Sequence, residues 1–103
     1  MKYANQIGWS DIDPYEVVKV ISDKTIEVRA MLVEKDPTWK PDIIPGGFAG
    51  HCINQHEQKW NIKSDESKKT FRIRLHKNGQ WKSKFGSRFM LQDTPVKFYD
   101  YNF

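Results

Sequence analysis

Three histidines and a single cysteine are the side chains of this sequence best suited to holding a metal ion. His51, Cys52 and His56 lie close together, and His76 follows further along. On a β-strand, Cys52 and His56 would share a face about 13 Å apart at ~3.3 Å per residue, and His51 would face the other way. On a helix, Cys52 and His56 could pair with His76 as a distant third ligand, but no C-x-x-C motif supports a zinc site. We therefore expect no metal site and no cofactor.

Catalysis would require a nucleophile or a pair of carboxylates. Cys52 follows His51 directly, but sequence neighbours on a strand point to opposite faces. A lone cysteine is more often a small buried hydrophobe. Asp11, Asp13 and Glu16 also cluster, although most such acids lie on solvated surface. Because P-loop, GxSxG, HExxH and dinucleotide-binding motifs are all missing, we predict a protein that is not an enzyme and has no catalytic residues.

A row of basic residues is a better candidate for function. Arg72, Arg74 and His76 occupy alternate positions, so on a strand they would line one face at roughly 7 Å spacing. Three further cations follow in the sequence: Lys82, Lys84 and Arg88. Such a row can follow a phosphate backbone while aromatic rings stack on bases. The alternative is that the row is simply the solvent face of an amphipathic strand, where Lys and Arg protect sheet edges from pairing with other chains.

A glycine-rich loop is the second candidate. The segment IPGGFAGH, residues 44–51, lies at the end of a long stretch with three prolines and three glycines, residues 35–50. Glycines let the backbone approach a ligand and present N–H groups to an anion. The alternative is a structural bend with its phenylalanine in the core. Because long loops in compact domains are usually functional or mobile, we expect a ligand site there, formed by Gly46, Gly47, Phe48, Gly50 and His51.

The charge is distributed unevenly along the 103 residues. Residues 1–54 carry six Lys/Arg and eight Asp/Glu, whereas residues 55–103 carry eleven Lys/Arg and five Asp/Glu. A basic half attracts anions such as nucleic acid or phosphorylated small molecules, but a net charge of +4 also serves solubility. The length predicts one domain, residues 1–103. With no long apolar run, no signal-peptide pattern and one cysteine, we expect no membrane contact and a cytoplasmic location.

Alternating patterns predict two hairpins. Residues 15–32 alternate around the turn residues 22–24, and residues 70–81 alternate around Asn78-Gly79. Asn-Gly is typical of a two-residue type I′ turn. In the second hairpin Phe71, Ile73 and Leu75 should face the core. A further strand is expected at 88–91, and the rings of residues 96–103 should close the core.

The elements between the hairpins are harder to assign. Residues 51–62 could be a long strand or a short helix, and residues 63–69 read as a solvated loop. Five or six short strands at this spacing predict a mainly β fold. The fold class is thus a small SH3-like barrel or a strongly bent antiparallel sheet, with one short helix near 51–60 left open as an alternative.

Three stretches resemble a group of small uncharacterised proteins encoded by phages and prophages: GWSDIDPYEVVKVI, GGFAGHCINQHEQKW and FRIRLHKNGQW with FYDYNF. The resemblance implies a phage-type accessory protein with a small β fold, in the cytoplasm of the host cell. It implies no reaction. Accessory proteins of this kind often act against host defence, as inhibitors or as sponges for nucleotide signals.

Together these observations predict a non-enzymatic module that captures an anionic ligand, a nucleotide signal or a short nucleic acid. Loop amides with Arg72, Arg74 or Arg88 would hold phosphate, and Phe48 or Trp39 would stack on a base. Since so small a chain should lack a deep pocket, the site would form between copies in a homo-oligomer. The alternatives are a protein–protein inhibitor that docks on a host enzyme without nucleotide, and a structural protein of the phage.

Overall fold

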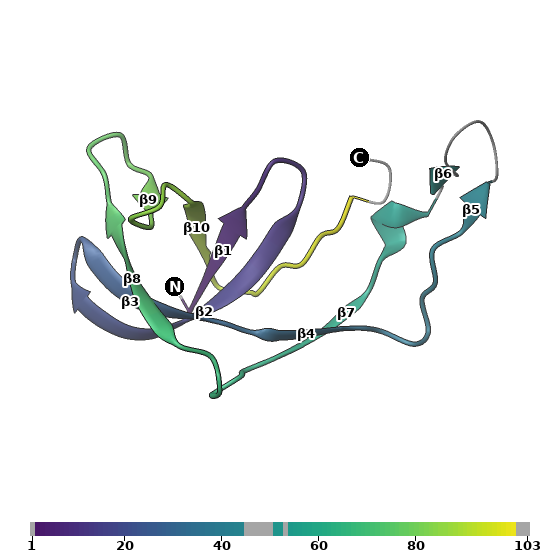
Figure 1. Cartoon of the computed structure of the whole chain (residues 1–103), viewed down its shortest axis with the longest axis horizontal. Helices are drawn as coiled ribbons and strands as arrows, with labels where there is room; N and C mark the ends of the chain where they lie inside the picture. The colour runs from purple at the N-terminus through teal and green to yellow at the C-terminus, as the bar shows by residue number, and fades with distance from the viewer. Residues whose placement is uncertain (1, 45–50, 53, 101–103) are drawn as a thin grey trace.

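The chain folds around a closed antiparallel barrel of six strands. The structure is a computed structural model that describes residues 2–44, 51–52 and 54–100. The barrel order is β1-β10-β9-β8-β3-β2, and it occupies one end of the molecule (Figure 1). Its strands are β1 (Tyr3–Ile7), β2 (Ile12–Ser22), β3 (Thr25–Ala30), β8 (Thr70–Leu75), β9 (Trp81–Lys82) and β10 (Arg88–Gln92). The predicted small β barrel is therefore confirmed.

The core lies inside this barrel because inward and outward residues alternate along each strand. Its buried members are Ala4, Ile26, Val28, Ile73 and Phe89. Ile73 faces the core as predicted, and Leu75 is half-buried. Phe71 differs from the prediction, because it touches two core-facing rings yet stays 36% exposed. The barrel interior is thus open beside Phe71.

The turn at Asn78-Gly79 is not the two-residue type I′ turn that the sequence predicts. Such a turn needs a positive φ at both central residues, but only Gly79 has one, at 82°. The Gly79 N–H donates to the His76 carbonyl and the His76 N–H donates to the Gln80 carbonyl, which makes a three-residue loop. Ser83 to Ser87 form a second loop with the same bonds and Gly86 at φ 88°. Both loops therefore need glycine at their third position.

A long arm leaves the barrel between β3 and β8. In it β4 (Leu32–Lys35) pairs with β7 (Trp60–Lys63), and β5 (Ile43–Ile44) pairs with β6 (His51–Cys52). The arm gives the molecule extents of 50 × 28 × 21 Å and reaches the right of Figure 1. The short helix allowed near 51–60 is one 3₁₀ turn, η1 (Gln55–Glu57). Leu32, the last residue of the predicted hairpin 15–32, instead begins β4 and is 42% exposed.

Residues 95–100 tie the arm to the barrel. Phe98 exchanges two backbone hydrogen bonds with Ile12, and Tyr99 exchanges two with the side chain of Gln58 on the arm. The start of this segment is held by the buried Asn5, whose Oδ1 accepts from the Val96 N–H. Phe98 lies outside the core cluster and Tyr99 is 45% exposed, so these two rings do not close the core as predicted, and the other two, Tyr101 and Phe103, lie outside the described residues.

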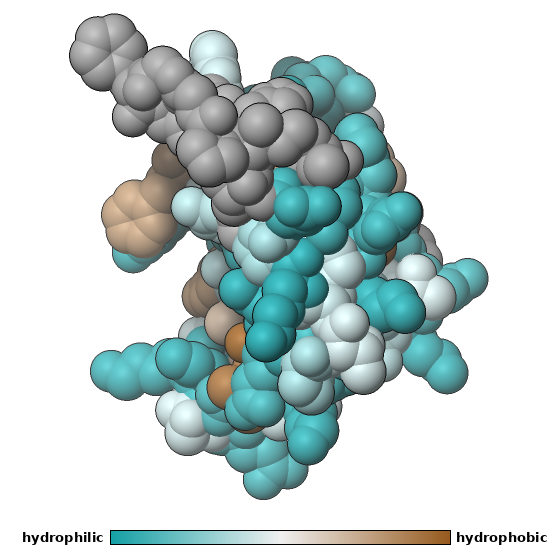
Figure 2. Space-filling view, turned by 90° about the vertical axis from the view of Figure 1, so that its right-hand side faces the viewer, coloured by the Kyte–Doolittle hydropathy of each residue, from teal (hydrophilic) through white to brown (hydrophobic). Residues whose placement is uncertain are grey.

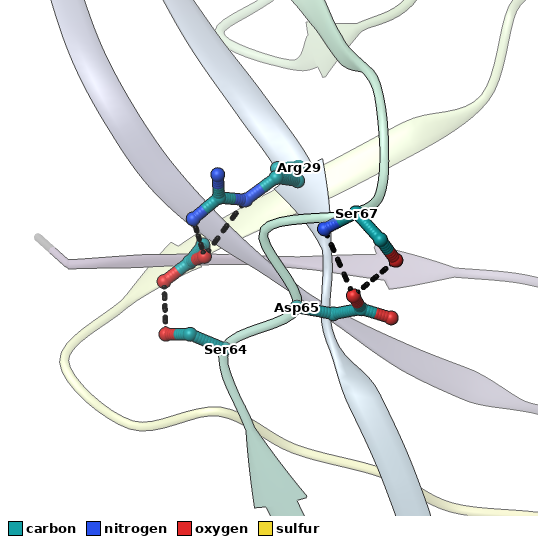
Figure 3. Close-up of polar contacts among 5 residues, drawn as sticks. Arg29, Ser64, Asp65 and Ser67 are labelled. Carbon is teal, nitrogen blue, oxygen red and sulfur yellow. Dashed lines mark hydrogen bonds and ion pairs between the residues drawn. The ribbon is translucent and has the colours of Figure 1, made fainter.

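Paired charges reinforce the junction between barrel and arm. The Glu16 carboxylate accepts hydrogen bonds from the Arg29 guanidinium and from Ser64 Oγ (Figure 3). Burial alone would raise the pKa of Glu16, but the bonds from Ser64 and Arg29 and the charge of Arg29 outweigh it, so that its pKa is lowered. Lys97 pairs with Asp13 at 2.6 Å and lies over the Trp60 ring. The charges of these two ion pairs therefore stabilise the fold.

Candidate functional site

Three cations stand in register across the barrel wall. Arg74 on β8 lies opposite Lys82 on β9, and Lys82 lies opposite Arg88 on β10. Residues directly opposite on antiparallel strands have Cβ atoms about 4.5–5.5 Å apart and point to the same face. Arg72 extends the set along β8 and is exposed, as is Arg74, while Ile73 between them is buried. The predicted exposed row of arginines is confirmed, and we call Arg72, Arg74, Lys82 and Arg88 the basic row.

This arrangement is unfavourable for the fold by itself. Like charges directly opposite on neighbouring strands destabilise a sheet. Within the described residues, no ion pair connects a member of the basic row to a carboxylate. Glu27 lies opposite Arg72 in the ladder and offsets part of its charge, while its carboxylate accepts a hydrogen bond from Thr70. Arg74, Lys82 and Arg88 have no carboxylate opposite them in the described ladders, so this part of the row keeps a concentrated positive charge.

A cleft of about 880 Å³ adjoins the basic row. It forms where the β8–β9 ladder stops after two residue pairs, Leu75–Trp81 and Arg74–Lys82. Beyond Lys82 the chain enters the β9–β10 loop and leaves β8 without a partner on that side. Arg72 and Phe71 then line one wall of the cleft, and the loop lines the other. Its charged lining consists of cations, with no carboxylate among the described residues: Arg72, Arg74, Lys82 and Lys84, together with His76.

Aromatic rings form the inner end of the cleft. Tyr15 meets Phe71 edge-on with ring centroids 5.6 Å apart, and meets Phe89 edge-on at 5.3 Å. At the mouth, Phe85 is 86% exposed and the Lys84 ammonium lies 5.1 Å from its ring centroid. Burial, and then the nearby charge of Asp13, raise the pKa of Tyr15, so its phenol stays protonated at neutral pH. The cleft can therefore offer ring faces, hydroxyl groups and several cations to the same ligand.

The predicted site residues do not all come together here. Arg72 and Arg74 line the cleft, and Arg88 stands beside it at the end of the basic row. Trp39 is only 5% exposed, so its predicted role as an accessible stacking ring is wrong. His51 contributes its backbone to β6 at the far end of the arm (Figure 1). The remaining predicted residues lie outside the described residues: Gly46, Gly47, Phe48 and Gly50.

The arm end differs in character from the cleft. Seen from that end, the visible described atoms are mostly hydrophilic, with only small hydrophobic areas (Figure 2). Near it Cys52 is buried, with Sγ 3.4 Å from Asn54 Oδ1, while His56 is exposed on η1. His76 belongs to the β8–β9 loop at the other end of the molecule. Among the described residues no group of three His, Cys, Asp or Glu side chains could hold a metal ion.

The three acids considered for catalysis all have structural partners. Glu16 and Asp13 form the ion pairs of the barrel–arm junction. Asp11 Oδ1 accepts the backbone N–H of Asp100 and so anchors the chain's last described residues. These contacts explain why acids gather in this part of the sequence, since Asp11 and Asp13 both hold residues 95–100 and Glu16 holds β3 and the start of the β7–β8 loop.

Sequence reasoning missed the aromatic part of the cleft. Tyr15 and Phe89 come from β2 and β10, and nothing in their local sequence shows that they meet Phe71. Phe85 carries a readable signal, because it stands between Lys84 and a glycine at a hairpin tip, where a ring cannot be buried by its own strand. One copy has an open cleft of its own, so a ligand site does not require two copies, and the homo-oligomer stays a prediction.

Two further findings concern the whole chain. Within residues 2–44, 51–52 and 54–100, no helix is long and apolar enough to cross a membrane. Comparison of the chain with protein-family models, with curated proteins and with solved structures gave no match.

Proposed function

We propose that this protein is a non-enzymatic binding module whose cleft takes an anionic ligand with a planar ring, such as a nucleotide or a short nucleic acid. The observation that carries the proposal is the basic row, a set of aligned cations without carboxylate partners beside an aromatic-lined cleft. A bound phosphate would neutralise the repulsion that the empty row creates.

The cleft has a suitable size and composition for such a ligand. Its volume of about 880 Å³ falls in the range of small-molecule sites, roughly 300–1,000 Å³. Arginine guanidinium groups bind phosphate oxygens in pairs, and aromatic faces stack on any base. The rings of Phe71 and Phe85 are the most accessible ones, whereas Phe89 is buried against Phe71. A phosphate would contact the basic row while a base contacts Phe71 or Phe85.

The decisive test removes charge from the cleft and measures the salt dependence of binding. The variant Arg72→Gln/Arg74→Gln and the control Lys68→Gln/Lys69→Gln each remove two positive charges, but the control residues lie in the exposed β7–β8 loop. For single strands the slope of log K against log salt changes by about 0.7 for each phosphate that the protein neutralises. We therefore expect the magnitude of the slope for labelled oligothymidine, measured by fluorescence anisotropy, to fall by about 1.4 in the cleft variant and to stay unchanged in the control.

Two outcomes would contradict the proposal. One is an equal slope and affinity in wild type and the cleft variant, since the arginines would then make no phosphate contact. The other is no binding of mononucleotides, cyclic dinucleotides or oligonucleotides even at the lowest salt. In that case the exposure of Trp9 (91%) and Phe85 (86%) favours the second candidate, docking on a protein partner through aromatic anchors. The phage-type accessory role implied by the sequence resemblance stays a prediction under either candidate.

A further inference from the structure

A second hollow adjoins the cleft on the other side of the β9–β10 loop. It has a volume of about 480 Å³ and lies between that loop and the β1–β2 turn. Gln6 and Ser87 line both the hollow and the cleft, so the two spaces share a border. Arg88 and Trp9 complete the wall of the hollow, and no described carboxylate lines it. The basic, ring-bearing character of the cleft therefore continues past the loop.

Trp9 is held in an exposed position by its turn. The Gly8 N–H donates to the Asp11 carbonyl at 2.9 Å, which leaves Trp9 at the tip with 91% of its surface exposed. The β1–β10 ladder pairs Ile7 with Arg88, so this tip stands at the same end of the barrel as the basic row. A large ring presented in this way contributes nothing to the core. Its exposure is explained if it contacts a ligand.

Trp9 and Phe85 are the two most exposed large hydrophobic side chains among the described residues. They come from neighbouring loops at the same end of the barrel, one on the β1–β2 turn and one on the β9–β10 loop. Arg88 lines the hollow together with Trp9, and Phe85 lines the adjoining cleft with the other cations. Two separated ring faces with cations beside them match successive bases and the phosphates that join them. A single nucleotide would occupy only one of these positions.

We infer that the ligand is a single strand of nucleic acid, which runs from the cleft over Phe85 to Trp9 with a phosphate near Arg88. The inference rests on the proposed function and narrows its ligand class. Unpaired bases are required, because bases stacked inside a duplex cannot reach the two rings. Ring faces and phosphate contacts do not distinguish ribose from deoxyribose, so both sugars are to be compared.

The test measures how binding affinity depends on strand length, in wild type and in a variant that lacks the Trp9 ring. Calorimetry with thymidine 5′-monophosphate, oligothymidines of two to eight residues and the matching oligouridines would be run on wild type and Trp9→Ala. Trp9 is almost wholly exposed, so its removal leaves the core intact. We expect wild-type affinity to rise with length up to about four nucleotides, the lower end of known single-strand sites. Trp9→Ala should lose about fivefold or more for the longer strands and nothing for the monophosphate.

The possible results separate a failure of this inference from a failure of the proposed function. Equal affinity of Trp9→Ala and wild type for long strands, or no dependence on length, would overturn the inference while monophosphate binding would still uphold the proposed function. A hairpin duplex that binds as tightly as the single strand would also overturn it. Failure of wild type to bind any of these ligands would instead overturn the proposed function and the inference together. A preference between the oligothymidine and oligouridine series supports the inference, and a further comparison of oligodeoxyuridine with oligouridine identifies the sugar, because these two strands differ only at the 2′ position.

Discussion

The charges at the barrel–arm junction and those of the basic row differ in how they are satisfied. At the junction, Arg29 is paired with Glu16 and Lys97 with Asp13, each within hydrogen-bond distance. In the basic row, Arg74, Lys82 and Arg88 oppose one another, and no described carboxylate forms an ion pair with them. The same residue types thus serve two purposes. Paired charges hold elements together, and aligned unpaired charges cost the fold stability while remaining available to a ligand.

The largest effect on stability should come from the junction. Glu16→Gln removes the charge that Arg29 faces, and both side chains are mostly buried. Breaking a fully buried ion pair costs ~3–5 kcal/mol, so we expect about 2 kcal/mol here because some water contact remains. Urea denaturation measures the change, and Glu66→Gln, an exposed carboxylate on the β7–β8 loop, is the matched control.

The difference in unfolding free energy between wild type and Glu16→Gln should depend on pH, which tests its cause. The pKa of Glu16 is lowered in the folded state, so its contribution is fully present above its ordinary value, near 4.5. It is lost as the pH falls through the lowered value, because folding then no longer favours the ionised form. The gap between wild type and Glu16→Gln should accordingly narrow in acid. A gap that stays constant down to about pH 2 would show that the charge is not its cause.

An intermediate effect is expected at the two matching loops. Gly79→Val and Gly86→Val should each cost about 1–2 kcal/mol, because a β-branched residue resists positive φ. No neighbouring atom lies within 4 Å of either added Cβ, so the expected cost comes from the backbone conformation rather than from a clash at Cβ. The asparagine variants at both positions should cost less, since asparagine tolerates this region. Thermal unfolding monitored by circular dichroism distinguishes the two series, and equal losses for valine and asparagine would refute the explanation.

The smallest predicted effect on stability is a gain rather than a loss. Lys82→Gln removes the middle charge of the basic row and should raise stability by about 0.2–1 kcal/mol, the usual size of a cross-strand charge term. The gain should disappear in about 1 M salt, where the Debye length is about 3 Å. Arg29→Gln is the contrasting variant, because it removes a paired charge and should lower stability. A clear loss of stability in Lys82→Gln at low salt would mean that the row is not under repulsion.

The sequence predicts most of the barrel strands, but it predicts neither β1 nor the alignment of the strands. Residues 70–75 alternate strictly, and that alternation alone places Ile73 inside and the arginines outside. Asn78-Gly79, however, fits both a two-residue loop and the end of a three-residue loop. The shorter loop would set Arg74 opposite Ser83 rather than Lys82. Register decides which side chains face each other across two strands. Because the loop length could not be read from the sequence, the alignment of the cations in the basic row could not be predicted.

The cleft was harder to predict for a related reason. Its rings come from β2, β8 and β10, so their proximity follows from barrel closure and from no local pattern. The arginines of the site were found because they share one strand and a period of two. The arm was also missed, because its strands are short and interrupted by turns. Local periodicity predicts faces of single elements, whereas sites shared by distant strands need the tertiary structure.

The pairing of β1 with β10 has a consequence for how the chain folds. Tyr3 lies opposite Gln92, so the ladder that closes the barrel joins strands from the two extremes of the described chain. Contacts so distant in sequence carry a large loop-closure cost and slow the search for the native state. During synthesis the hairpins β1–β2 and β2–β3 can form early, but the barrel stays open until β10 emerges. The cleft and its basic row, which depend on β9 and β10, are therefore among the last features to be completed.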